Sequence, residues 1–449
     1  MTIYREYEVY KDQELLKFIE SLENKFDLLN YEEKYSKLVN FSRNEDVPFH
    51  KWFRYREGFA GELIEQLIKD SGVEKEGIII DPFAGSGTTS VVAKQMDYDT
   101  FSIDVNPISS FITNVKLYDY SEIQLENIKS EINSYSLKSP ELIENCTIEL
   151  NNTKSIEKYF SKNNFMEIIQ IKKYIGKIED IVVQDFFRCG LLCIIEDVSD
   201  RRRDGNGLKR YDSKISDVKK TYIKKLEDML SDIKNHQKNN NCKGVCVLGS
   251  AEELSNLYHQ NFGNDQVEKT IIFSPPYPNS FDYFESYKLE LVVGDFAEDI
   301  KDIKRYRKDA VRSFIGVEKQ KQFNKYIKLI ADEIENRIPE KEKRTGKKDN
   351  RTRKVPNMIQ GYFYDMSMVI RECYEILNKK DRAYIVVDQS SYLGVVVPTD
   401  LIFSYFAELF GFKVNEIIEC RKARTSPQQF KQYPYLKHIL RESIVVLEK

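Results

Sequence analysis

Long apolar runs are absent from this sequence. No stretch of about 18 apolar residues exists, which argues against a membrane-spanning helix. The first six residues, Met1 to Glu6, contain no apolar core of a signal peptide, so we expect no export. Of the 449 residues, 31% are charged and 41% hydrophobic, a balance that indicates a soluble, globular, cytoplasmic protein with room for one large core plus insertions.

The sequence also lacks the ligands of a zinc site. Its seven cysteines are an odd and scattered set, and no pair of histidines stands at zinc-ligand spacing. Cys189 and Cys193, like Cys242 and Cys246, are four residues apart, but nothing completes either pair. We therefore expect reduced thiols and no metal.

A net charge of −3 does not by itself indicate a nucleic-acid-binding protein, but the basic residues are clustered. Residues 341–354 hold eight basic and two acidic side chains, residues 301–308 form a second basic stretch, and Arg201, Arg202 and Arg203 form a third. A solvated loop explains any one of these runs equally well. Three runs together favour phosphate contacts.

Strand and helix patterns alternate along much of the chain. Short apolar or β-branched runs predict strands at 78–80, 100–103, 244–248, 270–273 and 383–387, and helical periodicity marks 60–70, 90–96, 252–258, 362–377 and 399–409. Two further strands, 413–420 and 442–447, close the chain. Repeated strand–helix units predict an α/β fold with a mostly parallel sheet, and the closing pair suggests an antiparallel end.

Three segments interrupt or precede this alternation. Residues 1–45 are polar and helix-like, 120–241 form a helical insertion rich in Lys, Glu, Ile and Asn, and 298–358 form a second insertion that carries the strongest basic run. The remaining segments, 46–119, 242–297 and 359–449, are expected to build one catalytic domain.

A glycine-rich loop, Asp81-Pro82-Phe83-Ala84-Gly85-Ser86-Gly87-Thr88-Thr89, lies between a predicted strand and helix. Glycines there allow a ligand to approach the backbone closely. The loop lacks the Lys-Ser/Thr of a phosphate-binding P-loop, and Ser90 replaces the third glycine of a dinucleotide fingerprint. Asp104 follows Asp81 by 23 residues, near the spacing at which a carboxylate binds ribose hydroxyls.

A second motif, Ser274-Pro275-Pro276-Tyr277, follows the strand at 270–273. Together the two motifs resemble those of the S-adenosylmethionine (SAM)-dependent amino-methyltransferases of DNA, which methylate N4 of cytosine or N6 of adenine. The resemblance covers about half of the chain, in pieces, and implies a Rossmann-like class I methyltransferase sheet. In that family a serine at the first position of the tetrapeptide favours cytosine N4.

The resemblance implies a role for each motif residue. The cofactor residues would be Phe59, Asp81, Phe83, Ala84, Gly85, Ser86, Gly87, Thr88, Thr89, Asp104 and Ser250. The family usually has Asp where Ser250 stands, which weakens the expectation of a direct bond to the adenine amino group. Ser274 and the Pro275 carbonyl would accept hydrogen bonds from the target amine, Pro276 would complete the rigid loop, and Tyr277 would stack on a flipped base.

Target recognition is expected from an insertion, because no long domain follows the last predicted strand. We favour 298–358, helped by 201–210. The candidate DNA contacts are Arg201, Arg202, Arg203, Lys343, Arg344, Lys347, Lys348, Arg424, Gln428 and Gln429. Double-stranded DNA and a cognate restriction endonuclease are the expected partners.

Three alternatives stay open at this point. They are an adenine-N6 or RNA methyltransferase, a non-catalytic nucleic-acid-binding protein on the same fold, and a small-molecule methyltransferase. The complete Ser274–Tyr277 motif argues against the second, and the basic insertions argue against the third.

Overall fold

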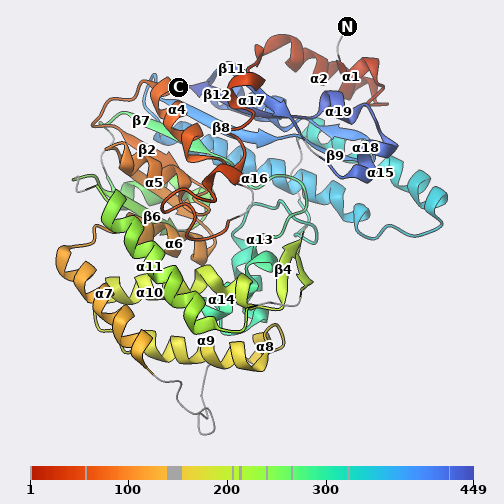
Figure 1. The fold of residues 1–449 in the computed structure, drawn as a ribbon. Coiled ribbons are helices and arrows are strands. Elements are labelled where there is room, and N and C mark those ends of the chain that lie inside the picture. Colours follow the sequence, from red (N-terminus) through yellow and green to blue (C-terminus); the bar gives the residue numbers. More distant parts are fainter. Residues whose placement is uncertain are drawn as a thin grey trace.

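The computed structural model describes the chain except for residues 1–2, 56–57, 139–153, 205–206, 212–214, 239–240, 264–265, 321–323 and 424. Its centre is one eight-stranded sheet with the strand order β1-β11-β12-β8-β7-β2-β3-β6 (Figure 1). These strands are β1 (Leu28–Asn30), β2 (Ile78–Asp81), β3 (Asp99–Asp104), β6 (Gly244–Leu248), β7 (Lys269–Phe273), β8 (Arg382–Asp388), β11 (Lys413–Lys422) and β12 (Arg441–Glu448).

Only β12 runs against its neighbours in this sheet. It pairs antiparallel with β8 and β11, and every other pair in the sheet is parallel. This is the Rossmann-like methyltransferase sheet with its reversed strand near the C-terminus, so the predicted fold class is confirmed. All seven predicted strands are present. The eighth, β1, lies in the segment expected to be helical, because three residues are too few to show a period of two.

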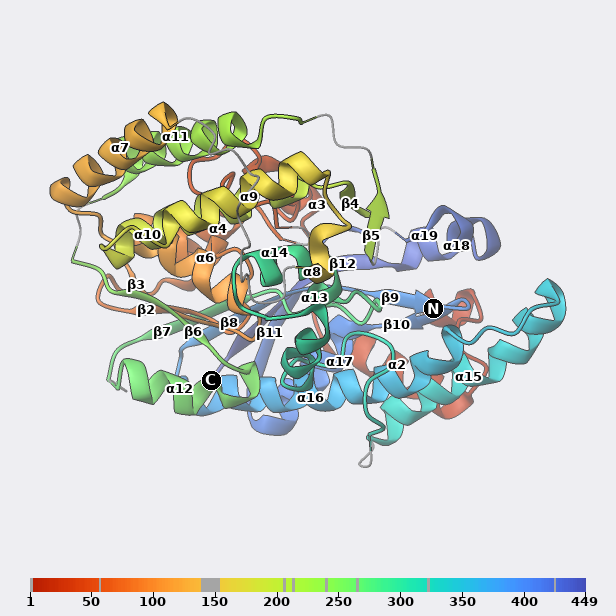
Figure 2. The same ribbon diagram turned by 90° about the horizontal axis from the view of Figure 1, so that it is seen from below.

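Alternate side chains of the strands enter different cores, as a doubly covered sheet requires. Ile78 and Ile80 pack with α2 (Gln13–Lys25), α12 (Leu254–Asn261), α16 (Val355–Ile376) and α17 (Thr399–Phe410). Ile79 packs on the other face with α4 (Gly61–Ser71) and α5 (Thr88–Gln95). Figure 2 shows α12, α16 and α17 together on one side of the sheet.

The helical insertion has a core of its own. Its elements are α7 (Glu122–Leu137), α8 (Lys154–Glu157), α9 (Lys162–Ile175), α10 (Ile181–Val198) and α11 (Val218–His236), with the hairpin β4 (Arg201–Asp204)–β5 (Gly207–Arg210). The insertion packs against α6 (Pro107–Leu117), α13 (Tyr283–Ser286) and α14 (Lys288–Val293). The basic run Arg201–Arg203 is therefore part of a strand.

The second insertion holds η4 (Ile300–Lys308), α15 (Lys325–Thr345) and η5 (Thr352–Lys354). Helix α16 begins at Val355 rather than near residue 362, since Pro356 is tolerated in a first helical turn. The remaining elements are α1 (Ile3–Glu6), α3 (Glu32–Tyr35), η1 (Phe41–Asn44), η3 (Ala251–Glu253), β9 (Ser390–Tyr392), β10 (Val395–Val397), α18 (Pro427–Gln432) and α19 (Leu436–Ile439).

Several elements gather on the side to which the carboxyl ends of the parallel strands point. Figure 2 shows β4–β5, β9–β10, α18, α19 and the far end of α15 on that side, to the right in the view. Among the described residues, none of the helices is long and apolar enough to cross a membrane.

Candidate active site at the carboxyl ends of the strands

A cavity opens where the chain order of the sheet reverses. Strand β2 has β3 on one side and β7 on the other, and ligands of open α/β sheets bind outside the carboxyl ends of strands at such a point. The lining residues are Tyr55, Gly58, Phe59, Asp81, Phe83, Ala84, Gly85, Ser86, Thr88, Thr89, Asp104, Val105, Asn106, Ser274, Pro276, Tyr283, Phe284, Ala310, Val311, Ser313 and Phe314. Nine of the eleven cofactor residues expected from the sequence are in this set; Gly87 and Ser250 are not.

The glycine-rich loop is tied to the ends of two strands. The Oδ1 atom of Asp81 accepts from the backbone N–H of Phe83 at 2.9 Å. Asp104 accepts from the N–H of Gly85 at 2.8 Å and from the N–H of Asn106 at 2.8 Å. Gly85 and Gly87 have φ angles of +55° and +80°, which glycine adopts without strain.

Two carboxyl groups line the cavity, that of Asp81, which is buried, and that of Asp104, which is half-buried. Burial raises the pKa of Asp81 to about 7 and that of Asp104 to about 6, although hydrogen bonds to both groups act in the opposite direction. The amide Nδ2 of Asn106, also buried, has no hydrogen-bond partner among the described residues. The carboxylates of Asp81 and Asp104 are stabilised by a cation or by hydroxyl donors, and the Asn106 amide has a hydrogen-bond donor to offer. These groups fit the ammonium and ribose groups of SAM.

An aromatic wall faces the glycine loop. Tyr55 stacks on Tyr287 with ring centres 5.2 Å apart and on Tyr283 with centres 5.9 Å apart. A Cβ atom at Gly85 would lie 3.0 Å from Cε1 of Tyr55. The sequence motifs did not single out Tyr55 or Tyr283, although aromatic residues are dense around both.

The second insertion also reaches the cavity, which the sequence did not predict. Ala310, Val311, Ser313 and Phe314 line it. Arg312 fixes this stretch to α16 through two-pronged hydrogen bonds to the carboxylate of Asp365. No local pattern marks such a contact, because the partners are far apart in the chain.

The tetrapeptide loop opens into the same cavity. It follows β7, and Ser274 and Pro276 are lining residues. The Ser274 hydroxyl donates to the Tyr277 hydroxyl at 3.1 Å, so the lone pairs of Ser274 Oγ remain able to accept. Pro275 is buried, and Tyr277 packs partly against the sheet core. The glycine-rich loop and the tetrapeptide loop thus share one cavity.

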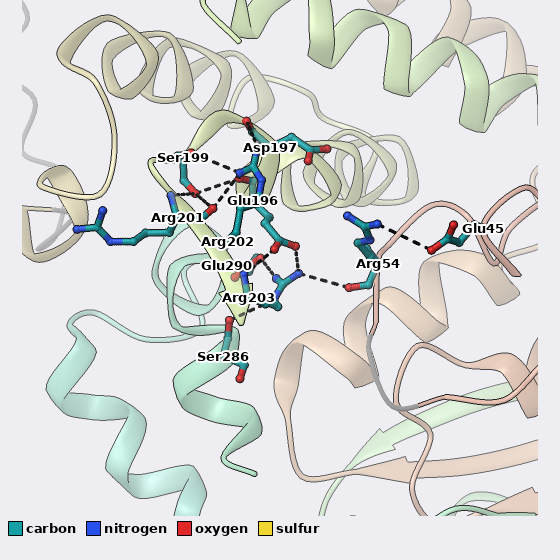
Figure 3. Close-up of polar contacts among 10 residues, drawn as sticks. All are labelled: Glu45, Arg54, Glu196, Asp197, Ser199, Arg201, Arg202, Arg203, Ser286 and Glu290. Carbon is teal, nitrogen blue, oxygen red and sulfur yellow. Dashed lines mark hydrogen bonds and ion pairs between the residues drawn. The ribbon is translucent and has the colours of Figure 1, made fainter. Parts of the chain in front are cut away.

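Arg203 does not have the role expected from the sequence. It is only 4% exposed, and its guanidinium pairs with Glu196 at 2.5 Å and with Glu290 (Figure 3). It also donates to the carbonyls of Ser286 and Arg54 and lies over the ring of Tyr287. A guanidinium used in this way is unavailable to DNA, so its assignment as a phosphate contact is wrong. Arg201 and Arg202 are half-exposed.

The other residues predicted to contact DNA differ in their exposure and in their side-chain partners. Lys343, Arg344, Lys347 and Lys348 are exposed and form no ion pair with a described residue, whereas Lys341 pairs with Asp349 and Arg353 with Glu342. Gln428 is exposed. Gln429 is bonded through both ends of its amide to Ser391, which disfavours base reading by this side chain. Arg424 lies outside the described residues.

Ser250 caps the short helix η3 and accepts from the N–H of Glu252. Its hydroxyl serves the local turn, and the residue lies apart from the cavity lining. In the part of the chain that the structure describes, no three His, Cys, Asp or Glu side chains come together as metal ligands.

The fold is that of a class I methyltransferase, and its glycine-rich loop and tetrapeptide loop both line one cavity at the carboxyl ends of the strands. A family model described as DNA methylase matches residues 6–111. The type II methyltransferase M.AvaI of Nostoc sp. is 29% identical over 435 residues, covering 90% of this chain and 88% of its own. M.BsoBI of Geobacillus stearothermophilus is 27% identical over 92% of this chain and 88% of its own.

These matches support the resemblance to the N4/N6 family of DNA amino-methyltransferases that the two motifs predicted. Among solved structures, the rRNA methyltransferase aviRa of Streptomyces viridochromogenes aligns with 87% of this chain and 85% of its own, at 7% identity and a TM-score of 0.27. A likeness this low adds nothing to the assignment.

Proposed function

We propose that this protein is a type II DNA methyltransferase that transfers the methyl group of SAM to the exocyclic N4 of cytosine in double-stranded DNA. The observation that carries the proposal is the shared cavity, in which the carboxylates of Asp81 and Asp104 and the acceptor loop at Ser274 line one space. A cognate restriction endonuclease is its proposed partner.

The proposed cofactor residues hold a cationic nucleoside. Bound SAM supplies an electrophilic methyl group. Asp104, fixed by the N–H groups of Gly85 and Asn106, is placed to accept from ribose hydroxyls, and Asp81 lies deeper, at the end of β2. Phe59, Phe83 and Tyr55 give the cavity an apolar wall that excludes water from the reacting groups.

Ser274 is the proposed acceptor for the target amine. The lone pair of an exocyclic amine is delocalised into the base ring, so the amine is a poor nucleophile. Because the only proton of the Ser274 hydroxyl is directed at Tyr277, its lone pairs can accept from the NH2 group, together with the Pro275 carbonyl. These bonds favour a pyramidal nitrogen whose lone pair points at the methyl group.

A base in a duplex has to leave the stack to reach this cavity, at a cost of a few kcal/mol. Exposed cations near the carboxyl ends of the strands, above all Lys343, Arg344, Lys347 and Lys348, are the proposed phosphate contacts that offset the cost. Lys343 and Arg344 are at the end of α15, and Lys347 and Lys348 directly follow it. This end of α15 extends on the same side as the hairpin β9–β10 (Figure 2).

Sequencing that detects modified bases tests the proposal directly. DNA from a host with the gene is compared with DNA from the same host without it. We expect N4-methylcytosine at one recurring sequence only when the gene is present. N6-methyladenine at such a sequence would overturn the cytosine assignment and keep the enzyme class, whereas unmodified DNA would overturn both.

We expect Ser274→Ala to lower the rate of methyl transfer to DNA by about 10²–10³-fold, by analogy with removal of one preorganised hydrogen-bonding group elsewhere. Tyr277→Ala should also slow transfer strongly. SAM affinity should stay near that of the wild type in both, because the removed atoms face the target base. Calorimetry with SAM and tritiated-methyl transfer measure the two quantities.

Ser367→Ala is the matched control for this change. Its hydroxyl donates to the Tyr364 carbonyl within α16, away from the cavity lining, and we expect a wild-type rate. Full activity of Ser274→Ala would show that the acceptor role is misassigned.

A further inference from the structure

A hydrogen bond joins the acceptor loop to a hairpin that the sequence did not single out. The hydroxyl of Tyr392 donates to the Pro278 carbonyl at 2.8 Å, and Pro278 directly follows the Ser274–Tyr277 motif. Tyr392 ends β9, which with β10 forms the hairpin after β8.

We propose that Tyr392 is a positioning residue for methyl transfer, whose hydroxyl fixes the acceptor loop through the Pro278 carbonyl. This inference rests on the proposed function, because it assigns Tyr392 a part in the reaction of that same cavity. Tyr392 is outside the cavity lining, so it acts through the loop rather than on substrate or cofactor.

The loop has few ways to fix itself. Pro275, Pro276 and Pro278 carry no backbone N–H group, so three of its residues can be held only through their carbonyls or by packing. Within the loop, the N–H of Asn279 donates to the Tyr277 carbonyl at 2.7 Å. At the far end, the N–H of Ser280 donates to the Ser313 carbonyl at 3.1 Å. The Tyr392 bond anchors the loop between the motif and that far end.

The surroundings keep the Tyr392 hydroxyl a donor. Burial raises its pKa to about 12, so it stays protonated in the physiological range. The Ser280 hydroxyl lies 3.3 Å from it, and Ser280 itself has a φ of +66°. A serine in this left-handed conformation is held there by its neighbours, and Tyr392 is one of them.

The hairpin does not depend on this bond. The Tyr435 hydroxyl donates to the Gly394 carbonyl at 2.7 Å, and Arg337 donates to the Leu393 carbonyl at 3.1 Å. Gln429 binds Ser391 from α18. Removal of the Tyr392 hydroxyl should therefore loosen the acceptor loop while the hairpin keeps its place.

Two variants separate loop positioning from hairpin stability. Tyr392→Phe removes the bond to Pro278, and Tyr435→Phe removes an equivalent tyrosine-to-carbonyl bond from Gly394, at the turn of the same hairpin. Single-turnover methyl transfer from tritiated SAM is measured with excess enzyme, on a duplex that carries the sequence found by modified-base sequencing. SAM affinity and the melting temperature are measured for the same proteins.

We expect Tyr392→Phe to slow the single-turnover rate by about ten- to a hundredfold, because a small misplacement of reacting groups has effects of that size. Its SAM affinity should match the wild type, and Tyr435→Phe should match the wild type in rate. A wild-type rate for Tyr392→Phe, or an equal loss in both variants, would overturn the inference while the wild-type enzyme still methylates DNA. An inactive wild-type protein would instead overturn the proposed function and the inference with it.

Discussion

Gly85 lines the cavity at a position where a side chain would be strained. Its φ is +55°, and a Cβ there would meet the Tyr55 ring at 3.0 Å. Gly85→Asp would add backbone strain of roughly 1–3 kcal/mol and a third carboxylate beside Asp81 and Asp104. We expect SAM affinity at least about a hundredfold weaker, measured by calorimetry. Gly72→Asp is the control, since Gly72 has a φ of +72° with nothing within 4 Å of its Cβ position. A comparable decrease in both variants would point to strain alone.

Asp81 and Asp104 predict how SAM binding depends on pH. Burial raises the pKa of both carboxyl groups, to about 7 and about 6, so the folded protein without ligand holds protons that the unfolded chain has released. Stability without ligand should therefore fall as pH rises from about 4 to about 7. A cationic ligand favours the ionised carboxylates, so SAM should bind more tightly as pH rises from about 5.5 to about 7.5. Calorimetry with SAM across that pH range measures the change in affinity. Asp81→Asn should make SAM affinity depend less on pH, and a pH-independent SAM affinity in the wild type would contradict the prediction.

At the scale of the element, the end of α15 and the residues that directly follow it carry the proposed DNA contact. Changing Lys343, Arg344, Lys347 and Lys348 to Gln should weaken duplex binding and flatten its salt dependence, because each phosphate that is no longer neutralised lowers the slope of log affinity against log salt by roughly 0.9. SAM binding should not change. Titration of labelled duplex at several salt concentrations measures the slope.

A second quadruple variant controls for net charge. Lys37, Lys129, Lys177 and Lys234 are also exposed and lie on α7 and α11 or shortly after α3 and α9, away from the α15 end. Their change to Gln should leave the slope near the wild type. If both quadruple variants lower the slope equally, the effect is one of total charge and not of this segment.

At the scale of the whole molecule, Arg203 joins the helical insertion to the cavity wall. It binds Glu196 of α10, Glu290 of α14 and the Arg54 carbonyl, next to Tyr55. Arg203→Met would leave two buried carboxylates unpaired, so we expect the free energy of unfolding to fall by about 3–5 kcal/mol. The salt slope of DNA binding should stay unchanged, since Arg203 is buried.

Lys209→Met on the same hairpin breaks an exposed pair with Asp204 and should cost no more than about 1 kcal/mol. Denaturant unfolding measures the free energy of unfolding of both variants. Similar decreases in the two would contradict the structural role of Arg203.

Local patterns determined much of what this protein is. Apolar runs predicted seven of the eight strands of the central sheet, and helical periodicity predicted helices between them. Buried strands and amphipathic helices have distinct short-range patterns, so both can be predicted from the sequence. The order of Asp81–Thr89 and Ser274–Tyr277 predicted the resemblance to DNA amino-methyltransferases, because each motif is contiguous and lies at a strand end. The carboxyl ends of parallel strands meet at one edge, so the two loops were bound to lie near each other.

Only the tertiary structure decided which side chains are free. Arg203 and Lys343 both belong to basic runs of the sequence. In the structure Arg203 is buried between Glu196 and Glu290, whereas Lys343 is exposed. Tyr55, Phe314 and Tyr392 reach the cavity or its loop from segments far from the motifs. Burial and long-range hydrogen bonds depend on how elements far apart in the sequence pack together. Such contacts produce no local or periodic pattern in the sequence, so the sequence does not predict them.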